Sequence, residues 1–282
     1  MIKTNTVNNI IDYIEDNIEK SLSIDDIALH IGYSRRYIEL LFNQYTGKPI
    51  GFYIRSRRLT RAAFYLKLTR MSILSIAFSL QFSSQQSFGR EFKKFSGYTP
   101  HQYRKMKGWD LSIIVSSLRT VYPFVPPLDL VELPISNFYG YKISYDTSVL
   151  DARVDSKGRN YRWSCLYQQL SFHKKNIILK TNFSPSLKSK NELSITTAIG
   201  IQDKEASIAK HNFNFGGGKY AKLDFLGSKD EYFIFYEKIY SHFLPFYRMT
   251  RSNKSDLEIL FYDDSIFSKG MIKIVIYIPI EC

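Results

Sequence analysis

The sequence predicts two domains of different fold class, an all-α domain over residues 1–108 and an α+β domain over residues 128–282, joined by a linker at 109–127. Apolar residues recur at helical spacing through the first hundred residues. After Trp109, apolar and polar residues alternate, as they do in strands. A third observation, an internal repeat in the first domain, indicates how its helices are arranged.

The first domain opens with an amphipathic helical pattern, and later helix starts carry their own signals. Ser23 precedes Asp26 by three residues, which is a capping-box pattern. Thr99 stands directly before Pro100, and proline is favoured in the first turn of a helix. We expect seven helices and no strand in this domain. The opening pattern consists of Val7, Ile10, Ile11, Ile14 and Ile18.

One segment of the first domain recurs 49 positions later. The segment IDDIALHIGYS aligns with ILSIAFSLQFS, which pairs Ala28 with Ala77 and Ser34 with Ser83. Each copy reads as a short helix, a tight turn, a serine able to cap, and a second helix. The small alanine lets the two helices approach closely. This is the plan of a helix-turn-helix, whose second helix enters the major groove of DNA.

Positive charge is concentrated in the second half of the first domain. The chain has 39 lysines and arginines against 26 acids, and residues 51–108 hold 12 basic side chains but a single acid, Glu91. Such a field predicts a polyanionic partner, which is nucleic acid or an acidic membrane. No apolar run reaches the ~18 residues that span a bilayer, and the first residues lack a signal-peptide pattern. We therefore expect a cytoplasmic, nucleoid-associated protein that binds double-stranded DNA and no membrane.

The second recognition helix offers side chains suited to reading bases. Glutamine pairs bidentately with adenine and arginine with guanine. These side chains carry several donors, which burial would leave unpaired, so we expect them to face the DNA. The expected base-reading positions of this helix are Gln85, Gln86, Ser87 and Arg90.

The first recognition helix carries a different set, namely Arg35, Arg36, Glu39 and Leu40. Glu39 can accept a hydrogen bond from a cytosine amino group but repels phosphate, whereas Leu40 offers only apolar contact, for instance to a thymine methyl group. This copy is expected to read fewer bases, or different ones.

A basic segment, PIGFYIRSRRLTRAAFYLKL, separates the two copies. As one helix from Ile50 to Leu68 it would be about 28 Å long. A rigid spacer of that length can hold two recognition helices about 34 Å apart, one turn of DNA. Phosphate contacts that position the domain are expected from Arg55, Arg57, Arg58, Arg61, Lys93, Lys94, Arg104 and Lys105.

The second domain shows strand patterns in NFYGYKISYD, NELSITTAIGI, GGGKYAKLDFLG and MIKIVIYIPI, with helical patterns around 159–174 and 230–247. Two cysteines are too few for a disulfide framework, and no Cys/His cluster has zinc spacing, so we expect neither a metal nor a cofactor. The GGG triplet at 216–218 lacks the Lys-Ser/Thr of a phosphate-binding loop, which indicates a turn before a strand.

The segments SILSIAFSLQFSSQQSFGREFKKFSGYTPHQYRK and IGFYIRSRRLTRAA resemble the signatures of the AraC/XylS family of bacterial transcription regulators, over residues 6–106. Within it the chain is similar to the MarA, SoxS and Rob group, in which a monomer binds an asymmetric site, and to activators of capsule and fimbrial operons. The resemblance implies base contacts for Gln85, Gln86, Ser87 and Arg90, and contact with RNA polymerase.

Two departures from the family pattern stand out. Arg36, Glu39 and Leu40 occupy positions where the family has Trp, Gln and Arg, which predicts recognition of a different DNA sequence. Gln81 stands where the family turn usually has glycine. A left-handed glutamine there would cost about 1 kcal/mol.

The order of the two domains resembles the Rob group, whose second domain has the GyrI-like effector-binding fold. That fold often presents a glutamate to cationic aromatic ligands, and Glu258 in DLEILF occupies the corresponding place, so the resemblance implies a small cationic or aromatic effector. Trp163, Tyr220 and Tyr236 are candidates to line such a pocket. The alternative is that Glu258 is a solvated acid at a strand edge.

The leading interpretation is a sequence-specific transcription regulator, an activator by resemblance and not an enzyme. Two alternatives stay open: an architectural DNA-binding protein without sequence preference, and an enzyme tethered to DNA by its basic helices. No histidine stands in a recognisable catalytic or metal-binding pattern.

Overall fold

The computed structural model describes residues 2–119, 125–149, 156–204 and 211–281. The chain forms two compact units. The N-terminal unit comprises Met1–Lys67, Met71–Met106 and Ile113–Phe124, and the C-terminal unit comprises Leu68–Arg70, Lys107–Ser112 and Val125–Cys282. Residues 109–127, expected as a linker, thus divide between the two units, and residues 120–124 of that linker lie outside the described ranges.

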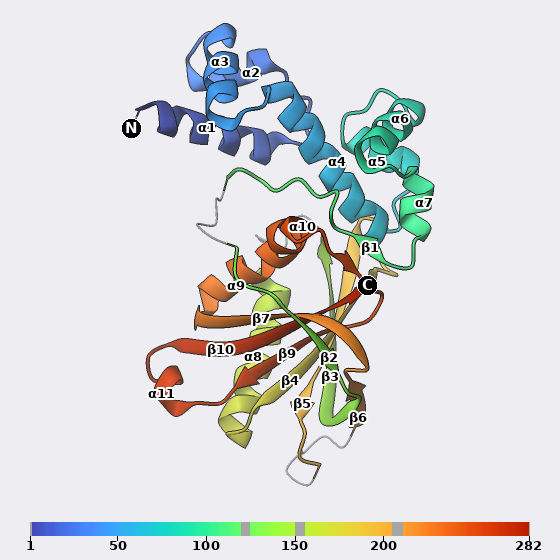
Figure 1. Cartoon of the computed structure of the whole chain (residues 1–282), viewed down its shortest axis with the longest axis vertical. Helices are drawn as coiled ribbons and strands as arrows, with labels where there is room; N and C mark the ends of the chain where they lie inside the picture. Colours follow the sequence, from blue (N-terminus) through green and yellow to red (C-terminus); the bar gives the residue numbers. More distant parts are fainter. Residues whose placement is uncertain (1, 120–124, 150–155, 205–210, 282) are drawn as a thin grey trace. The chain divides into compact units, whose positions relative to one another are not determined.

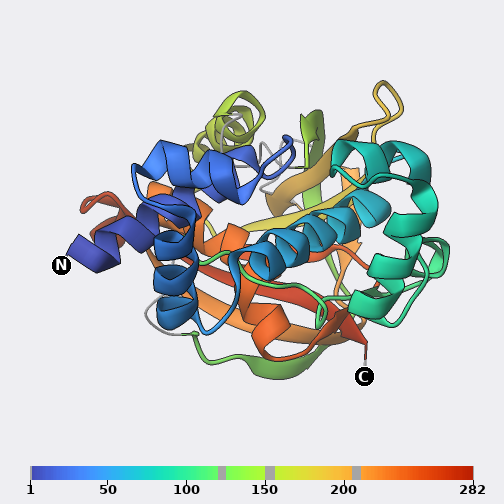
Figure 2. The ribbon, with the colours of Figure 1, turned by 90° about the horizontal axis from the view of Figure 1, so that it is seen from above.

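Seven helices follow one another between residues 2 and 105, as the sequence predicts, without a strand in this described range (Figure 1). Figure 2 shows α4 running between the α2–α3 pair and the α5–α6 pair. The helices are α1 (Ile2–Asn17), α2 (Ile24–Ile31), α3 (Arg35–Thr46), α4 (Ile50–Leu68), α5 (Ile73–Ser79), α6 (Gln85–Ser96) and α7 (Pro100–Lys105).

The helix ends follow local sequence signals. Ser23 and Asp26 form the predicted capping box of α2, and Thr99 caps α7 with Pro100 in its first turn. Ser34 caps α3, as the repeat predicts. The cap of α6 is Ser84, not Ser83, because the residue inserted in the second copy precedes the cap.

A buried ion pair joins α1 to α4. Glu15 is 3% exposed and Arg57 7% exposed. Arg57 Nε lies 2.7 Å from Glu15 Oε1, and its Nη2 lies 3.1 Å from Oε2. Tyr53 donates its hydroxyl to the same carboxylate at 2.6 Å. All the polar atoms of this contact are therefore paired inside an apolar core that includes Ile14 and Phe42.

The charge environment keeps Glu15 ionised. Burial by itself would raise its pKa, but the charge and hydrogen bonds of Arg57, with the Tyr53 hydroxyl, lower the pKa from 4.5 to about 2. Burial and the neighbouring carboxylate raise the pKa of Tyr53 to about 12. The tyrosine is therefore a neutral donor at physiological pH.

Residues 113–119 form a strap across α1 and α4. The amide of Val115 donates to Thr60 Oγ1 at 3.0 Å, and the amide of Leu118 donates to Tyr53 OH at 3.1 Å. Arg119 forms ion pairs of 2.7 Å with acids of α1, Asp12 and Asp16. The strap extends the N-terminal unit beyond α7.

The described strands of the C-terminal unit make one antiparallel sheet. Its order is β1-β8-β10-β9-β4-β5-β3-β6, and β7 pairs with both β10 and β2. The strands are β1 (Trp109–Asp110), β2 (Asp129–Leu133), β3 (Ser136–Ser148), β4 (Ile177–Pro185), β5 (Glu192–Ile201), β6 (His211–Phe215), β7 (Gly218–Ser228), β8 (Thr250–Arg251), β9 (Asp256–Phe261) and β10 (Met271–Glu281).

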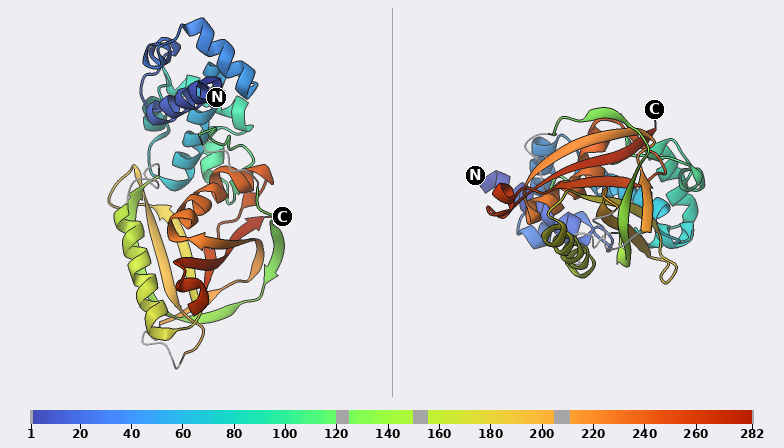
Figure 3. Two further views of the ribbon diagram at one scale, coloured as in Figure 1. Left: turned by 90° about the vertical axis from the view of Figure 1, so that its left-hand side faces the viewer. Right: turned by 90° about the horizontal axis from the view of Figure 1, so that it is seen from below.

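The two longer helical segments of the C-terminal unit fall where the sequence predicts them, and the structure adds a short helix that the sequence did not predict. They are α8 (Ser156–His173), α9 (Lys229–Lys238), which continues through a π-helical turn (Ile239–Phe243) into α10 (Leu244–Phe246), and the short α11 (Asp264–Phe267). Figure 3 shows α8 lying along the sheet. The predicted combination of an all-α domain and a domain of helices and strands is thus observed. Within the described ranges, no helix is both long and apolar enough to cross a membrane.

The register of the sheet assigns side chains to its two faces. Glu258 pairs with Leu179 on β4 and with Ile276 on β10, and its side chain lies on the face that α8 and α9 cover. Leu257 precedes Glu258 and pairs with Lys180 and Tyr277, so these side chains lie on the opposite face.

We predict that Glu15→Gln destabilises the N-terminal unit by about 3–5 kcal/mol at pH 7, because it leaves the Arg57 charge buried and unpaired. The lowered pKa of Glu15 means that its contribution is complete above pH 4.5 and is lost as the pH falls towards 2. This acid-dependent loss should be absent from the variant.

Urea unfolding at several pH values, followed by circular dichroism at 222 nm, measures the effect. Both tryptophans, Trp109 and Trp163, belong to the C-terminal unit, so the tryptophan-fluorescence transition is an internal control that should stay in place. Equal pH dependence in the variant and the parent protein would contradict the role assigned to Glu15.

Candidate functional site

The helix α6 presents the expected polar face to solvent. Gln85, Gln86 and Arg90 are exposed, whereas Phe88 and Phe92 are fully buried. The helix start is fixed by Ser84 Oγ, which accepts from the amide of Ser87 at 3.0 Å. The two amides and the guanidinium therefore project from the first turns of a helix whose position is set by its core and its cap.

The helix α3 presents a different surface. Arg35 is engaged by two acids, Asp25 at 3.2 Å and Glu39 at 3.6 Å, and all three side chains are exposed enough for these pairs to be weak. Arg36 is exposed, and Leu40 is 53% exposed. The negative charge of Glu39 offsets the positive charge of Arg35, so this helix carries less net positive charge than its two arginines suggest.

Gln81 adopts the left-handed conformation expected of the glycine that it replaces, with φ of 64°. Its side chain gives a compensating contact that the sequence did not predict. The Gln81 amide Nε2 donates to the carbonyl of Glu19, at 2.7 Å. Glu19 lies between α1 and α2, so this bond joins the turn of the second helix-turn-helix copy to the segment that precedes the first copy.

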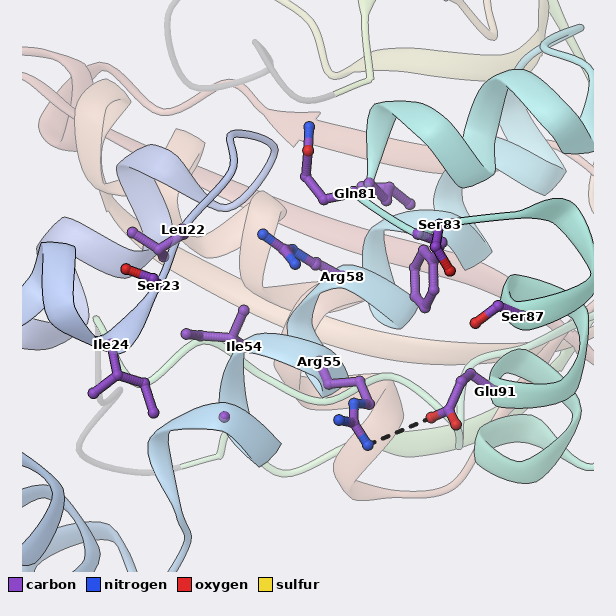
Figure 4. A pocket seen from close by; sticks show the side chains of 13 residues that line it. Leu22, Ser23, Ile24, Ile54, Arg55, Arg58, Gln81, Ser83, Ser87 and Glu91 are labelled. Carbon is purple, nitrogen blue, oxygen red and sulfur yellow. Dashed lines mark ion pairs between the residues drawn. The ribbon is translucent and has the colours of Figure 1, made fainter.

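A groove with a volume of about 470 Å³ lies between the two copies (Figure 4). Its walls come from the start of α2, one side of α4, and the α5–α6 turn with α6. Arg55 on α4 and Glu91 on α6 form an exposed ion pair of 3.6 Å across it. Glu91, the single acid between residues 51 and 108, therefore links the spacer helix to the second recognition helix.

The structure corrects the prediction that Arg57 contacts phosphate. Its guanidinium is buried against Glu15 and also donates to the carbonyl of Val115. All three guanidinium nitrogens of Arg57 donate hydrogen bonds inside the N-terminal unit, so this side chain cannot reach a DNA backbone. Arg57 instead fixes the packing of α1, α4 and the strap.

Three other members of the expected phosphate set hold helix ends together. Arg58 donates to the carbonyls of Ile18 and Lys20, both at 2.9 Å. Arg104 donates to those of Leu66 and Met71. Arg61, half-buried, pairs with Glu19 at 3.4 Å. The exposed members of the set are Arg55, Lys93, Lys94 and Lys105.

In the C-terminal unit, Glu258 lies in an interior strand and is 1% exposed, which excludes the alternative of a solvated acid at a strand edge. Its carboxylate already has two partners. Arg162 on α8 forms an ion pair with Oε1, and Tyr232 on α9 donates its hydroxyl to Oε2. Burial would lower the pKa of Arg162, but the negative charge of Glu258 raises it, so the guanidinium stays charged.

The aromatic residues expected around Glu258 do not all gather there. Trp163 is buried on α8 with its ring centroid 5.6 Å from that of Tyr232, so it does adjoin the Glu258 site. Tyr236 binds a different carboxylate, Asp256, at 2.9 Å. Ile276 pairs with both Glu258 and Leu223 of β7, so the side chains of these residues lie on one face of the sheet. Tyr220 is three positions before Leu223 in the same strand, so its side chain lies on the opposite face.

Sequence reasoning missed the partners of these acids. Arg162 and Tyr232 complete the Glu258 site, and Arg251 pairs with Asp256 at 2.7 Å. Arg162 and Tyr232 are far from Glu258 along the chain, so no local sequence motif identifies them as its partners. The signal available in the sequence was the presence of acids in an otherwise apolar strand, since a buried carboxylate requires a cationic or hydroxyl partner.

Comparison with known proteins agrees with this division of the chain. Residues 17–106 match the family described as helix-turn-helix domain, and residues 131–281 match the family described as GyrI-like small molecule binding domain. The second match alone covers more than half of the chain.

The matches to three similar proteins span between 74% and 92% of this chain. The F1 operon positive regulatory protein of Yersinia pestis is 35% identical over 261 residues, 92% of this chain and 84% of that protein. The putative HTH-type transcriptional regulator YkgA of Escherichia coli is 38% identical over 210 residues, 74% of this chain and 87% of that protein. The transcriptional regulator Rob of Salmonella typhimurium is 28% identical over 265 residues, 92% and 91% of the two chains.

The repeated helix pairs, the exposed polar face of α6, the sheet with its buried glutamate and these similarities lead to one conclusion. The chain is a DNA-binding transcription regulator of the AraC family, in the group that joins an AraC-type helix-turn-helix domain to a GyrI-like domain.

Proposed function

We propose that this regulator binds one asymmetric DNA site as a single chain, with α6 and α3 in successive major grooves. The observation that carries the proposal is the exposed set Gln85, Gln86 and Arg90 on a capped helix at one end of the α4 spacer. The spacer has 19 residues, and its length is about 28 Å at 1.5 Å per residue. This length suits two probes near one DNA turn apart.

The α6 residues are proposed to read bases, and α3 to contribute Arg36 and Leu40. Arg35 and Glu39 would have to exchange their mutual ion pair for contacts with DNA. Phosphate contacts are proposed for Arg55, Lys93, Lys94 and Lys105, whose charges are exposed. An architectural protein without sequence preference would have no use for paired exposed amides, which carry no charge.

The proposed outcome of binding is activation of transcription through contact with RNA polymerase. The support is the similarity to the F1 operon positive regulatory protein. The same proposal assigns the C-terminal unit to the sensing of a small molecule, since its family is described as small molecule binding.

A cationic effector at Glu258 would have to replace Arg162. The carboxylate is fully buried and already neutralised, so a second cation gains nothing while the arginine stays. The Nε of Arg162 and the Nε1 of Trp163 have no hydrogen-bond partner within the described residues, which makes this contact less than fully satisfied. Movement of α8 is therefore the proposed opening step.

We expect Gln86→Ala and Arg90→Ala each to weaken specific DNA binding by about 1–3 kcal/mol, because each removes one bidentate base contact. Binding to unrelated DNA should change little. The measurement is fluorescence anisotropy with a duplex selected from a random library and with a scrambled duplex. Gln168→Ala, an exposed glutamine of α8, is the matched control. An equal loss of affinity for both duplexes would show that these residues contact phosphates and would contradict their assignment to base reading.

Replacement of an exposed lysine should alter the salt dependence of DNA binding. We predict that Lys94→Ala lowers the slope of log K against log salt by about 0.9, the value for one phosphate contact. The double variant Glu15→Gln, Arg57→Met removes a basic residue that is buried, so its slope should equal that of the parent protein. If the double variant loses slope and Lys94→Ala does not, the structural division of the basic residues is wrong.

Removal of Arg162 should create a cation site. We predict that Arg162→Met binds benzyltrimethylammonium at least tenfold more tightly than the parent protein, because the buried Glu258 charge then lacks a cation. Isothermal titration calorimetry measures the change. The double variant Arg162→Met, Glu258→Gln should lose the gain. Identical affinity in all three proteins would show that the ligand binds elsewhere.

A further inference from the structure

A second pocket lies on the face of the sheet opposite to Glu258. It has a volume of about 210 Å³ and opens beside the turn between β6 and β7. Leu257 and Tyr220 line it, and the strand register places both side chains on the face of the sheet that α8 and α9 do not cover. The pocket and the Glu258 site are therefore separated by the thickness of the sheet.

The pocket is lined by two lysines and no acid. Lys180 Nζ donates to the carbonyl oxygen of Asn214 at 2.8 Å and to its Oδ1 at 3.1 Å. Lys254 Nζ donates to the carbonyl of Gly217. An ammonium group has three donors. Each lysine is thus held in place by the pocket wall and retains a proton for a ligand.

The charge at this pocket lacks a counterion among its lining residues. Burial lowers the pKa of Lys180, and the nearby charge of Lys142 lowers it further. Both effects disfavour the ammonium form, and an anion beside it would oppose them. The lining therefore offers two fixed cations and an electrostatic reason to bind negative charge.

The glycine triplet explains how Lys254 reaches the pocket wall. Gly216 and Gly217 have φ of 80° and 75°, which favour glycine. A Cβ on Gly218 would lie 2.5 Å from Lys254 Nζ, and one on Gly216 would lie 2.1 Å from the carbonyl of Pro134. The triplet is thus the turn that the sequence indicates, and it also leaves the space that the ammonium occupies.

We propose that this pocket binds a compact oxyanion, a carboxylate or a phosphate, with its charged oxygens between Lys180 and Lys254. The volume lies below the roughly 300–1,000 Å³ of sites for drug-sized ligands, so the ligand is small. Leu257 and Tyr220 provide an apolar floor for a short carbon body or a ring. The inference is independent of the DNA contacts and of any ligand at Glu258.

Calorimetry on the full chain tests the proposal with inorganic phosphate and with benzoate, and benzylammonium serves as the probe of opposite charge. We expect at least one of the two anions to bind. Lys180→Gln and Lys254→Gln should each weaken that binding roughly ten- to a hundredfold, the effect of losing one charge-assisted hydrogen bond. The relative affinities of phosphate and benzoate identify which oxyanion the pocket prefers.

Three controls keep the result specific. Lys269→Gln removes an equal charge from an exposed position outside the pocket, and Lys48→Gln removes one from an exposed position of the N-terminal unit. Both should leave anion affinity unchanged. Gly218→Ala keeps both charges but displaces Lys254, so it should weaken binding. The proposal is overturned if neither anion binds, if benzylammonium binds equally well, or if the pocket variants and the controls lose affinity alike.

Discussion

The buried contact between Glu15 and Arg57 is the constraint on which the geometry of the N-terminal unit depends. It joins α1 to the spacer helix, and Tyr53 and the strap complete its hydrogen bonds. Separation of the two charges inside the core would leave each without a partner, which is far more costly than the loss of an exposed pair. The spacer is thereby anchored near its middle, between the two recognition helices that it carries.

Local signals predicted the helices well, because a cap or a repeat acts within a few residues. Ser23 and Thr99 marked helix starts correctly, and the repeat located both recognition helices. The functions of the arginines in α4 could not be read in this way. Arg57 stands in a uniformly basic run, but its acid lies 42 residues away, and only the tertiary fold separates it from exposed Arg55. For the same reason, the sequence did not identify Arg162 as the partner of Glu258, from which it is 96 residues away.

The two units stabilise their buried carboxylates with the same kinds of partner. Glu15, Glu258 and Asp256 each pair with one arginine and accept at least one tyrosine hydroxyl. Burial raises the pKa of these tyrosines, so they stay neutral and donate without adding charge. Each of these three buried carboxylates is therefore balanced by a cation within the core.

The alternation of the chain between its units bears on how such a protein can evolve. Leu68–Arg70 and Lys107–Ser112 belong to the C-terminal unit, whereas Ile113–Phe124 returns to the N-terminal one. A recombination event with a single crossover would carry pieces of one unit into the other. Exchange of the C-terminal unit for that of a distant relative therefore requires several matched junctions along the chain.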